Sequence, residues 1–153
     1  YKSNFTIKYL IGISPAGLIT FVSKPYGGRA SDNVIFEQSN LISLMDRQDA
    51  LMVDRGFKID NICNEKGITL IRPPFLKGKN QFTREEALET KSIASARVHI
   101  ERINQRIKVF KIFRNTFCWG HAHLAHDIMI IISGICNLGS PIFSADKFNT
   151  QFE

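Results

Sequence analysis

A glutamate between two cations lies along the longest helix that this sequence predicts. Arg97, Glu101 and Lys108 are separated by four and seven residues, and on a helix with 100° per residue they fall within about 40° of one another. A carboxylate at the edge of a buried face can be held rigidly and still face a cleft. The same spacing is typical of a solvated helix face, where Arg97 and Glu101 would form an ordinary i,i+4 pair.

A second candidate carboxylate, Asp54, directly follows a short apolar segment at residues 50–53. Carboxylates at the carboxyl ends of buried strands often line ligand sites in α/β folds. They also often cap the turn that follows the strand. The pattern alone therefore leaves a functional and a purely structural interpretation open for Asp54.

Strands dominate the first half of the chain. Alternating apolar residues and β-branched runs predict them, and Pro15 and Gly17 provide the turn of an antiparallel hairpin. Ser31 or Asp32 is a natural N-cap for a helix that ends near Met45. The expected strands cover residues 6–13, 18–23, 50–53 and 68–71.

Helices dominate the second half. Thr83 and Glu86 form a capping box at the start of the long helix. Its core-facing residues fall within an arc of about 100°. A second, apolar helix is expected at residues 121–138, followed by an irregular tail. The core stripe of the long helix comprises Ile93, Ala96, Ile100, Ile103, Ile107 and Phe110. This order of elements predicts an α/β fold, a mixed sheet flanked by helices.

Composition sets broad limits on the function. With 44% hydrophobic and 22% charged residues, the 153-residue chain fits one globular domain. Its formal charge of +6 permits a polyanionic partner. Three widely spaced cysteines argue against a disulfide framework and fit the cytosol or the nucleus. The longest apolar run is too short for the roughly 20 residues of a membrane span, so no membrane association is expected.

Four segments of the sequence form an ordered set of motifs. They are YGGRASD at 26–32, VDRGF at 53–57, IRPPFLKGK at 71–79 and ETKSIASARVHIERINQRIKVFKIF at 89–113. Together they resemble the DDE-type transposase domain of the Harbinger/PIF and IS4/IS5-related class. In that family the second catalytic Asp lies in an (A/V)D(R/K)G(F/Y) motif and the third acid in an R-x3-E-x6-K pattern. The resemblance covers about residues 1–140, a partial catalytic domain, and leaves 141–153 as the tail.

The resemblance implies a fold, a reaction and roles for four residues. The fold would be RNase H-like, and the reaction would be DNA cleavage or strand transfer assisted by Mg²⁺ or Mn²⁺. Asp54 and Glu101 would be catalytic metal ligands, whose hard oxygen atoms suit hard cations. Arg97 and Lys108 would contact the phosphates of DNA. A nuclear location is expected, with a homo-oligomer or a separate DNA-binding partner protein.

Two departures from the family pattern bear on activity. Ala94 replaces the tyrosine that usually stands three residues before the arginine. The first catalytic Asp belongs on an opening strand, and residues 1–5 contain no acid. We therefore expect a chain that lacks the first strand, with an incomplete triad, a weak metal site and no appreciable cleavage on its own.

Two other hypotheses remain open from the sequence. The chain could be a domesticated, non-catalytic module that binds DNA or protein, or a basic domain with no role in nucleic-acid binding. Salt-dependent DNA binding discriminates the last hypothesis from the others, because phosphate contacts release counterions.

Overall fold

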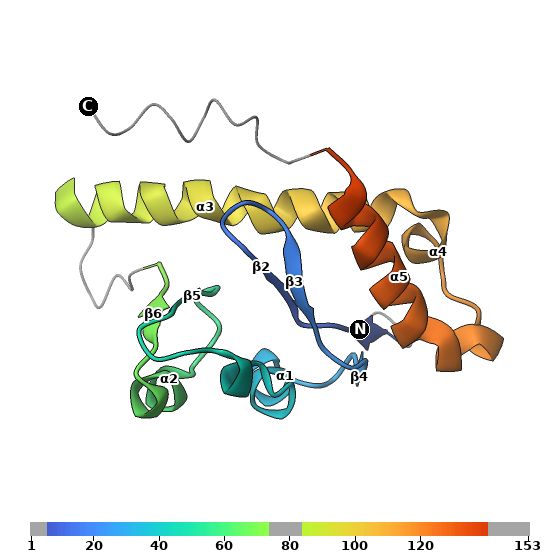
Figure 1. The fold of residues 1–153 in the computed structure, drawn as a ribbon, viewed down its shortest axis with the longest axis horizontal. Coiled ribbons are helices and arrows are strands. Elements are labelled where there is room, and N and C mark those ends of the chain that lie inside the picture. Colours follow the sequence, from blue (N-terminus) through green and yellow to red (C-terminus); the bar gives the residue numbers. More distant parts are fainter. Residues whose placement is uncertain (1–5, 74–83, 141–153) are drawn as a thin grey trace. The chain divides into compact units, whose positions relative to one another are not determined.

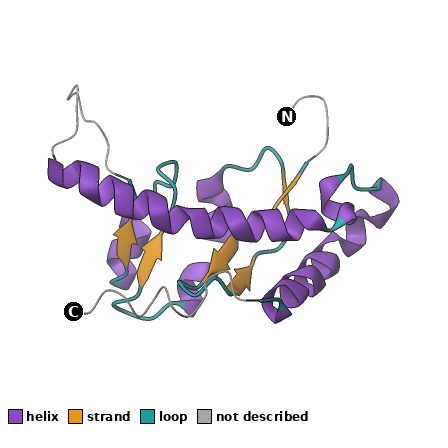
Figure 2. Ribbon diagram, turned by 90° about the horizontal axis from the view of Figure 1, so that it is seen from above, coloured by secondary structure: helices purple, strands orange, loops and turns teal. Residues whose placement is uncertain are grey.

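The structure is a computed structural model that describes residues 6–73 and 84–140. The described residues fall into two compact units. The first contains the residues up to 10 and from 26 to 97, and the second contains those from 11 to 25 and beyond 97. The long helix α3 (Arg84–Val109) contributes to both units and has no interruption (Figure 2).

The first unit contains two short strand pairs and the helices between them. Its strands are β1 (Ile7–Lys8), β4 (Tyr26–Gly27), β5 (Ala50–Met52) and β6 (Thr69–Ile71). Its shorter helices are α1 (Asp32–Gln38), the 3₁₀ helix η1 (Leu41–Leu44) and α2 (Asp60–Lys66). Strands β1 and β4 pair antiparallel, whereas β5 and β6 pair in parallel. Helix α2 lies between β5 and β6 in the sequence. The segment β5–α2–β6 is therefore a compact βαβ unit.

The helix expected to end near Met45 is interrupted. Ser31 is its N-cap, as predicted, and the Ser31 hydroxyl accepts a hydrogen bond from the Val34 N–H. Asn40 then adopts a left-handed conformation with φ of 64°, which no regular helix accommodates. The chain continues as η1, so the predicted helix forms as two short ones.

A hydrophobic core joins α1, α2 and the start of β6. Phe36, Ile59, Cys63 and Ile68 are almost completely buried. Leu51 and Val53, from β5 and the residue after it, pack against this cluster. The core thus anchors the strand that leads into Asp54.

The second unit packs a hairpin against a helix. Strands β2 (Ile11–Ile13) and β3 (Ile19–Val22) form the predicted antiparallel hairpin (Figure 1). Beyond α3 come α4 (Lys111–Arg114), the 3₁₀ helix η2 (Trp119–Leu124) and α5 (Ala125–Leu138). The side chain of Asn137 on α5 bonds both backbone groups of Ile19, accepting from its N–H at 2.8 Å and donating to its carbonyl at 2.9 Å.

The predicted core stripe of α3 agrees with the burial of its residues. Ile93, Ile103 and Ile107 are at most 4% exposed, whereas Glu101 and Lys108 are exposed. The cap residue Thr83 lies outside the described residues. The apolar face of the helix is therefore the one that the 3.6-residue period predicts.

The fold class is confirmed as mixed α/β and is compatible with an RNase H-like fold. Two further local expectations were wrong. The expected strand at 6–13 is split into β1 and β2, and the apolar helix expected from residue 121 begins as η2.

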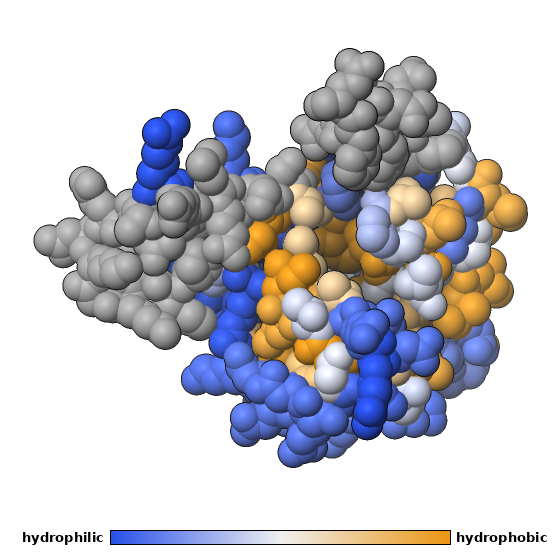
Figure 3. All heavy atoms as spheres, turned by 60° about the vertical axis from the view of Figure 1, so that its left-hand side comes forward, coloured by the Kyte–Doolittle hydropathy of each residue, from blue (hydrophilic) through white to orange (hydrophobic). Residues whose placement is uncertain are grey.

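Apolar side chains also reach the surface. On α5, Ile131, Ile135 and Leu138 are 60%, 48% and 89% exposed. Figure 3 shows apolar surface of this kind beside hydrophilic side chains. In the described part of the chain, no helix is both long enough and apolar enough to cross a membrane.

Candidate functional site

Asp54 occupies the first position of a tight turn at the carboxyl end of β5. The ladder with β6 extends one residue beyond β5, because the Val53 N–H donates to the Ile71 carbonyl at 3.0 Å. The Phe57 N–H then donates to the Asp54 carbonyl at 3.1 Å. The sequence Asp54-Arg55-Gly56-Phe57 thus forms a hydrogen-bonded turn that presents the first side chain at a strand end.

The Asp54 carboxylate has two partners in the first unit. One oxygen, Oδ1, accepts a hydrogen bond of 2.7 Å from the Arg55 backbone N–H. The other, Oδ2, lies 3.3 Å from the Arg97 guanidinium. The two side chains are 59% and 37% exposed, so water can still reach both ends of this ion pair. A carboxylate in such a position can exchange the cation beside it for another.

The ion pair joins the two motifs that the sequence singled out. Asp54 belongs to the VDRGF segment, and Arg97 is the first residue of the R-x3-E-x6-K pattern on α3. Glu101 follows Arg97 by four residues on the same helix, and Lys108 lies two turns further on. Both are exposed and belong to the second unit. That Asp54 and Glu101 meet at one site therefore stays a prediction.

A comparison with protein-family models decides the family. The model for the DDE superfamily endonuclease matches residues 1–137. The chain belongs to this family. No curated protein and no solved structure matches the chain.

Membership of the DDE superfamily endonucleases has general chemical consequences. These enzymes use divalent metal ions, and a transposase-type nuclease acts on DNA. In this member of the family, Asp54 has the hard oxygen donors that Mg²⁺ and Mn²⁺ prefer. Its solvent exposure and its existing cationic partner fit a position for a metal ion. Within residues 6–73 and 84–140, no three His, Cys, Asp or Glu side chains gather as a metal site.

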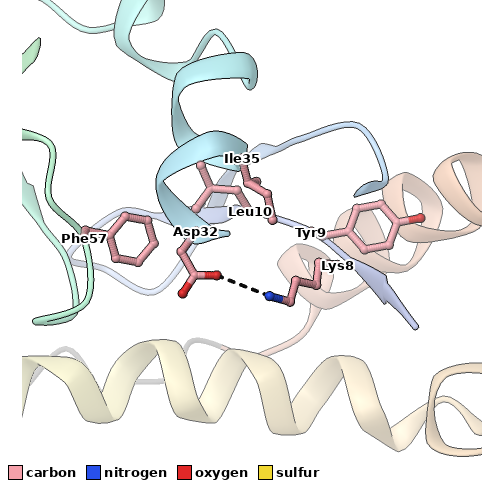
Figure 4. Close-up of a pocket in the computed structure, with 6 residues that line it drawn as sticks. All are labelled: Lys8, Tyr9, Leu10, Asp32, Ile35 and Phe57. Atoms are coloured by element: carbon pink, nitrogen blue, oxygen red, sulfur yellow. Dashed lines mark ion pairs between the residues drawn. The ribbon is translucent and has the colours of Figure 1, made fainter. Parts of the chain in front are cut away.

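A separate pocket lies in the first unit, and Phe57, the last residue of the Asp54 turn, is one of the residues that line it. Lys8 pairs with Asp32 at 3.7 Å and donates to the Ala30 carbonyl at 2.9 Å. In Figure 4 the Tyr9 hydroxyl points away from this ion pair, and burial raises the pKa of Tyr9. The pocket is lined by Lys8, Tyr9, Leu10, Asp32, Ile35 and Phe57. Its charged groups already satisfy each other.

Sequence reasoning missed one contact next to the candidate site. Arg72 follows β6 and forms a two-point ion pair with Asp60 on α2. The same guanidinium donates to the Phe57 carbonyl, at the end of the Asp54 turn. The sequence offered one signal, an arginine one residue past a strand that was expected to pair beside Asp54.

Proposed function

We propose that this chain supplies two acids, Asp54 and Glu101, to the metal centre of a DNA-cleaving transposase of the Harbinger/PIF and IS4/IS5-related class. The ion pair between Asp54 and Arg97 supports the proposal most directly. It links the strand-end acid to the helix whose next turn holds Glu101. Neither the Asp54 turn nor the face of α3 requires that link, since residues in turns and on helix faces form ion pairs with many partners.

Each of the four residues has a role in the proposal. Asp54 and Glu101 hold Mg²⁺ or Mn²⁺ through carboxylate oxygens. The bound ions would activate a water or a 3′-hydroxyl and stabilise the leaving oxygen. Arg97 and Lys108 contact the DNA phosphates through charge-assisted hydrogen bonds. Because two carboxylates are fewer than the family pattern requires, we expect this chain alone to bind metal weakly and to cleave DNA poorly.

The proposal extends to partners and location. We infer nuclear action on transposon or target DNA, either as a homo-oligomer or with a separate DNA-binding protein. The basic charge of +6 supports a polyanionic partner. A domesticated module that binds DNA or protein without cleaving is the alternative function.

Metal binding by single-residue variants tests the proposal. Mn²⁺ bound to the purified chain is measured by electron paramagnetic resonance for the wild type, Asp54→Asn and Glu101→Gln. Glu65→Gln, at an exposed carboxylate on α2, is the matched control. Both site variants should lose most of the binding and the control should retain it. Equal binding in all four proteins contradicts a shared metal site and favours the non-catalytic alternative.

DNA binding supplies the second readout. Affinity for duplex DNA should fall with salt, and Arg97→Gln or Lys108→Gln should lower both the affinity and the salt slope. Lys66→Gln, which removes one positive charge from the end of α2, is the control for net charge. Absence of salt-dependent DNA binding would point to a basic domain without a nucleic-acid role.

A further inference from the structure

We propose that Arg72 is a positioning residue for Asp54, because it fixes the turn that presents this carboxylate. The inference rests on the proposed function, since the position of Asp54 matters to chemistry only if it is a metal ligand. Arg72 lies outside the motif residues to which the family resemblance gives a catalytic or DNA-binding role. Its contacts come from the geometry of the βαβ unit.

The Arg72 guanidinium connects two segments at once. Its Nη1 donates to the Phe57 carbonyl at 3.1 Å and to Asp60 Oδ2 at 2.8 Å. Its Nη2 donates to Asp60 Oδ1 at 2.5 Å. The planar fork of arginine thus binds the carboxylate at two points, and this fixes the orientation of the whole group. The end of the turn is thereby linked to the first residue of α2.

Ile71, the residue before Arg72, holds the other end of the same turn. The Ile71 carbonyl accepts the hydrogen bond from the Val53 N–H, immediately before Asp54. Ile71 and Arg72 therefore hold the backbone on both sides of the acid, one through its carbonyl and the other through its side chain. Between these two points, the hydrogen bond from the Phe57 N–H to the Asp54 carbonyl closes the turn.

Phe57 and Lys58 also make contacts that involve other groups than the Phe57 carbonyl, which Arg72 binds. The Phe57 ring packs edge-to-face against Phe36, with centroids 6.4 Å apart. The Lys58 N–H donates to Asn33 Oδ1 at 2.8 Å. These contacts anchor the ring and the following residue, whereas the Arg72 bond restrains the Phe57 carbonyl and so the plane of the peptide that ends the turn.

Partial exposure separates positioning from global stability. Arg72 and Asp60 are 24% and 48% exposed, and ion pairs accessible to water add little to the stability of a fold. Three hydrogen bonds from one rigid group nevertheless restrict the local conformations of the turn. Loss of Arg72 should therefore increase the mobility of the Asp54 turn without unfolding the β5–α2–β6 segment.

Two conservative variants test the proposal in the whole chain. Arg72→Lys retains the charge but loses the fork, and Asp60→Asn retains the shape but weakens the pair. Lys66→Gln is the control on the same helix. Amide hydrogen exchange is followed by NMR at Arg55 and Phe57, with Cys63 and Ile68 as core references. Mn²⁺ affinity is measured in parallel by electron paramagnetic resonance.

The expected result is local. In Arg72→Lys, exchange at Arg55 and Phe57 should accelerate about ten-fold while the core amides do not change. Mn²⁺ affinity should fall about ten-fold, the lower end of the usual effect of outer-shell changes. Asp60→Asn should give a smaller effect in the same direction, and Lys66→Gln should behave as the wild type.

Failure of this proposal and failure of the proposed function are distinguishable. If the wild type binds Mn²⁺ and Arg72→Lys binds it equally well, the positioning role is wrong and the metal site stands. Uniform acceleration that includes Cys63 and Ile68 also overturns it, because Arg72 would then be a structural residue only. If the wild type binds no Mn²⁺ at all, the metal site itself fails and the positioning role falls with it.

Discussion

The guanidinium of Arg97 lies 3.3 Å from Oδ2 of Asp54, where the cation of a metal site would compete for the same oxygen. An ion pair with both partners partly exposed is weak, about 0.2–1 kcal/mol in typical measurements. It is therefore strong enough to orient the carboxylate and weak enough to exchange. Arg97 can stabilise the acid without metal and contact phosphate when a metal ion replaces it.

Arg97→Gln should tighten Mn²⁺ binding by about two- to five-fold, because the competing cation is removed. Arg97→Lys is the control, since it keeps a positive charge near Asp54. Titration of free Mn²⁺ by electron paramagnetic resonance gives both affinities. Weaker binding in Arg97→Gln would mean that the arginine supports the metal site instead of competing with it.

Two faces of α3 should differ in their effect on stability. Ile103 is 1% exposed, so Ile103→Ala should lower the free energy of unfolding by about 2–5 kcal/mol. Glu101→Gln changes an exposed side chain and should cost little or slightly stabilise the fold. Urea denaturation followed by circular dichroism compares the two variants. Similar losses for both would mean that the faces of the helix are assigned wrongly.

Adjacent glycines at the end of β4 should respond differently to alanine. A Cβ on Gly28 would collide with the Thr6 side chain and come within 3.1 Å of the Thr6 carbonyl, whereas a Cβ on Gly27 would meet nothing within 4 Å. Gly28→Ala should therefore cost about 1–3 kcal/mol through overpacking. Gly27→Ala is the matched control, and thermal unfolding of both proteins measures the difference. Equal melting temperatures would exclude this close approach.

The stability of the protein should fall as the pH is lowered, because His99 takes up a proton less readily in the folded state than in the unfolded state. Burial, followed by the charge of Arg102, lowers the pKa of His99. The unfolded chain therefore takes up the proton first as the pH falls, so stability is fully present above about pH 6.5 and declines below it. Denaturation midpoints at a series of pH values, compared with those of His99→Gln, measure this contribution. Identical slopes for the two proteins would argue against it.

Local patterns predicted the parts of the fold that depend on near neighbours. The hairpin of β2 and β3, the Ser31 cap and the buried stripe of α3 follow from turn residues, a capping side chain and the helical period. Helix α2 was missed because its seven residues have little apolar periodicity and its N-cap, Ile59, makes no side-chain bond. It forms because Ile59 and Cys63 are buried in the core.

The candidate site shows the same division between local and distant information. The motifs identified Asp54 and Arg97 separately, but no local pattern predicts an ion pair between a strand end and a distant helix. The contacts of Arg72 with Asp60 and the Phe57 carbonyl could not be predicted, for the same reason. The ion pair depends on where α3 lies relative to the end of β5, and the Arg72 contacts depend on the packing of β5, β6 and α2. Tertiary structure alone provides both.

The Asn137 side chain has a consequence for how this protein behaves at high concentration. A primary amide has the same donor and acceptor as a peptide group, and at Ile19 it bonds both backbone groups as a neighbouring strand would. A foreign chain therefore cannot extend the hairpin at this position, so self-association through strand addition is blocked there. Asn137 thus protects the edge of β3 at Ile19 from aggregation, a role unrelated to any chemistry at Asp54.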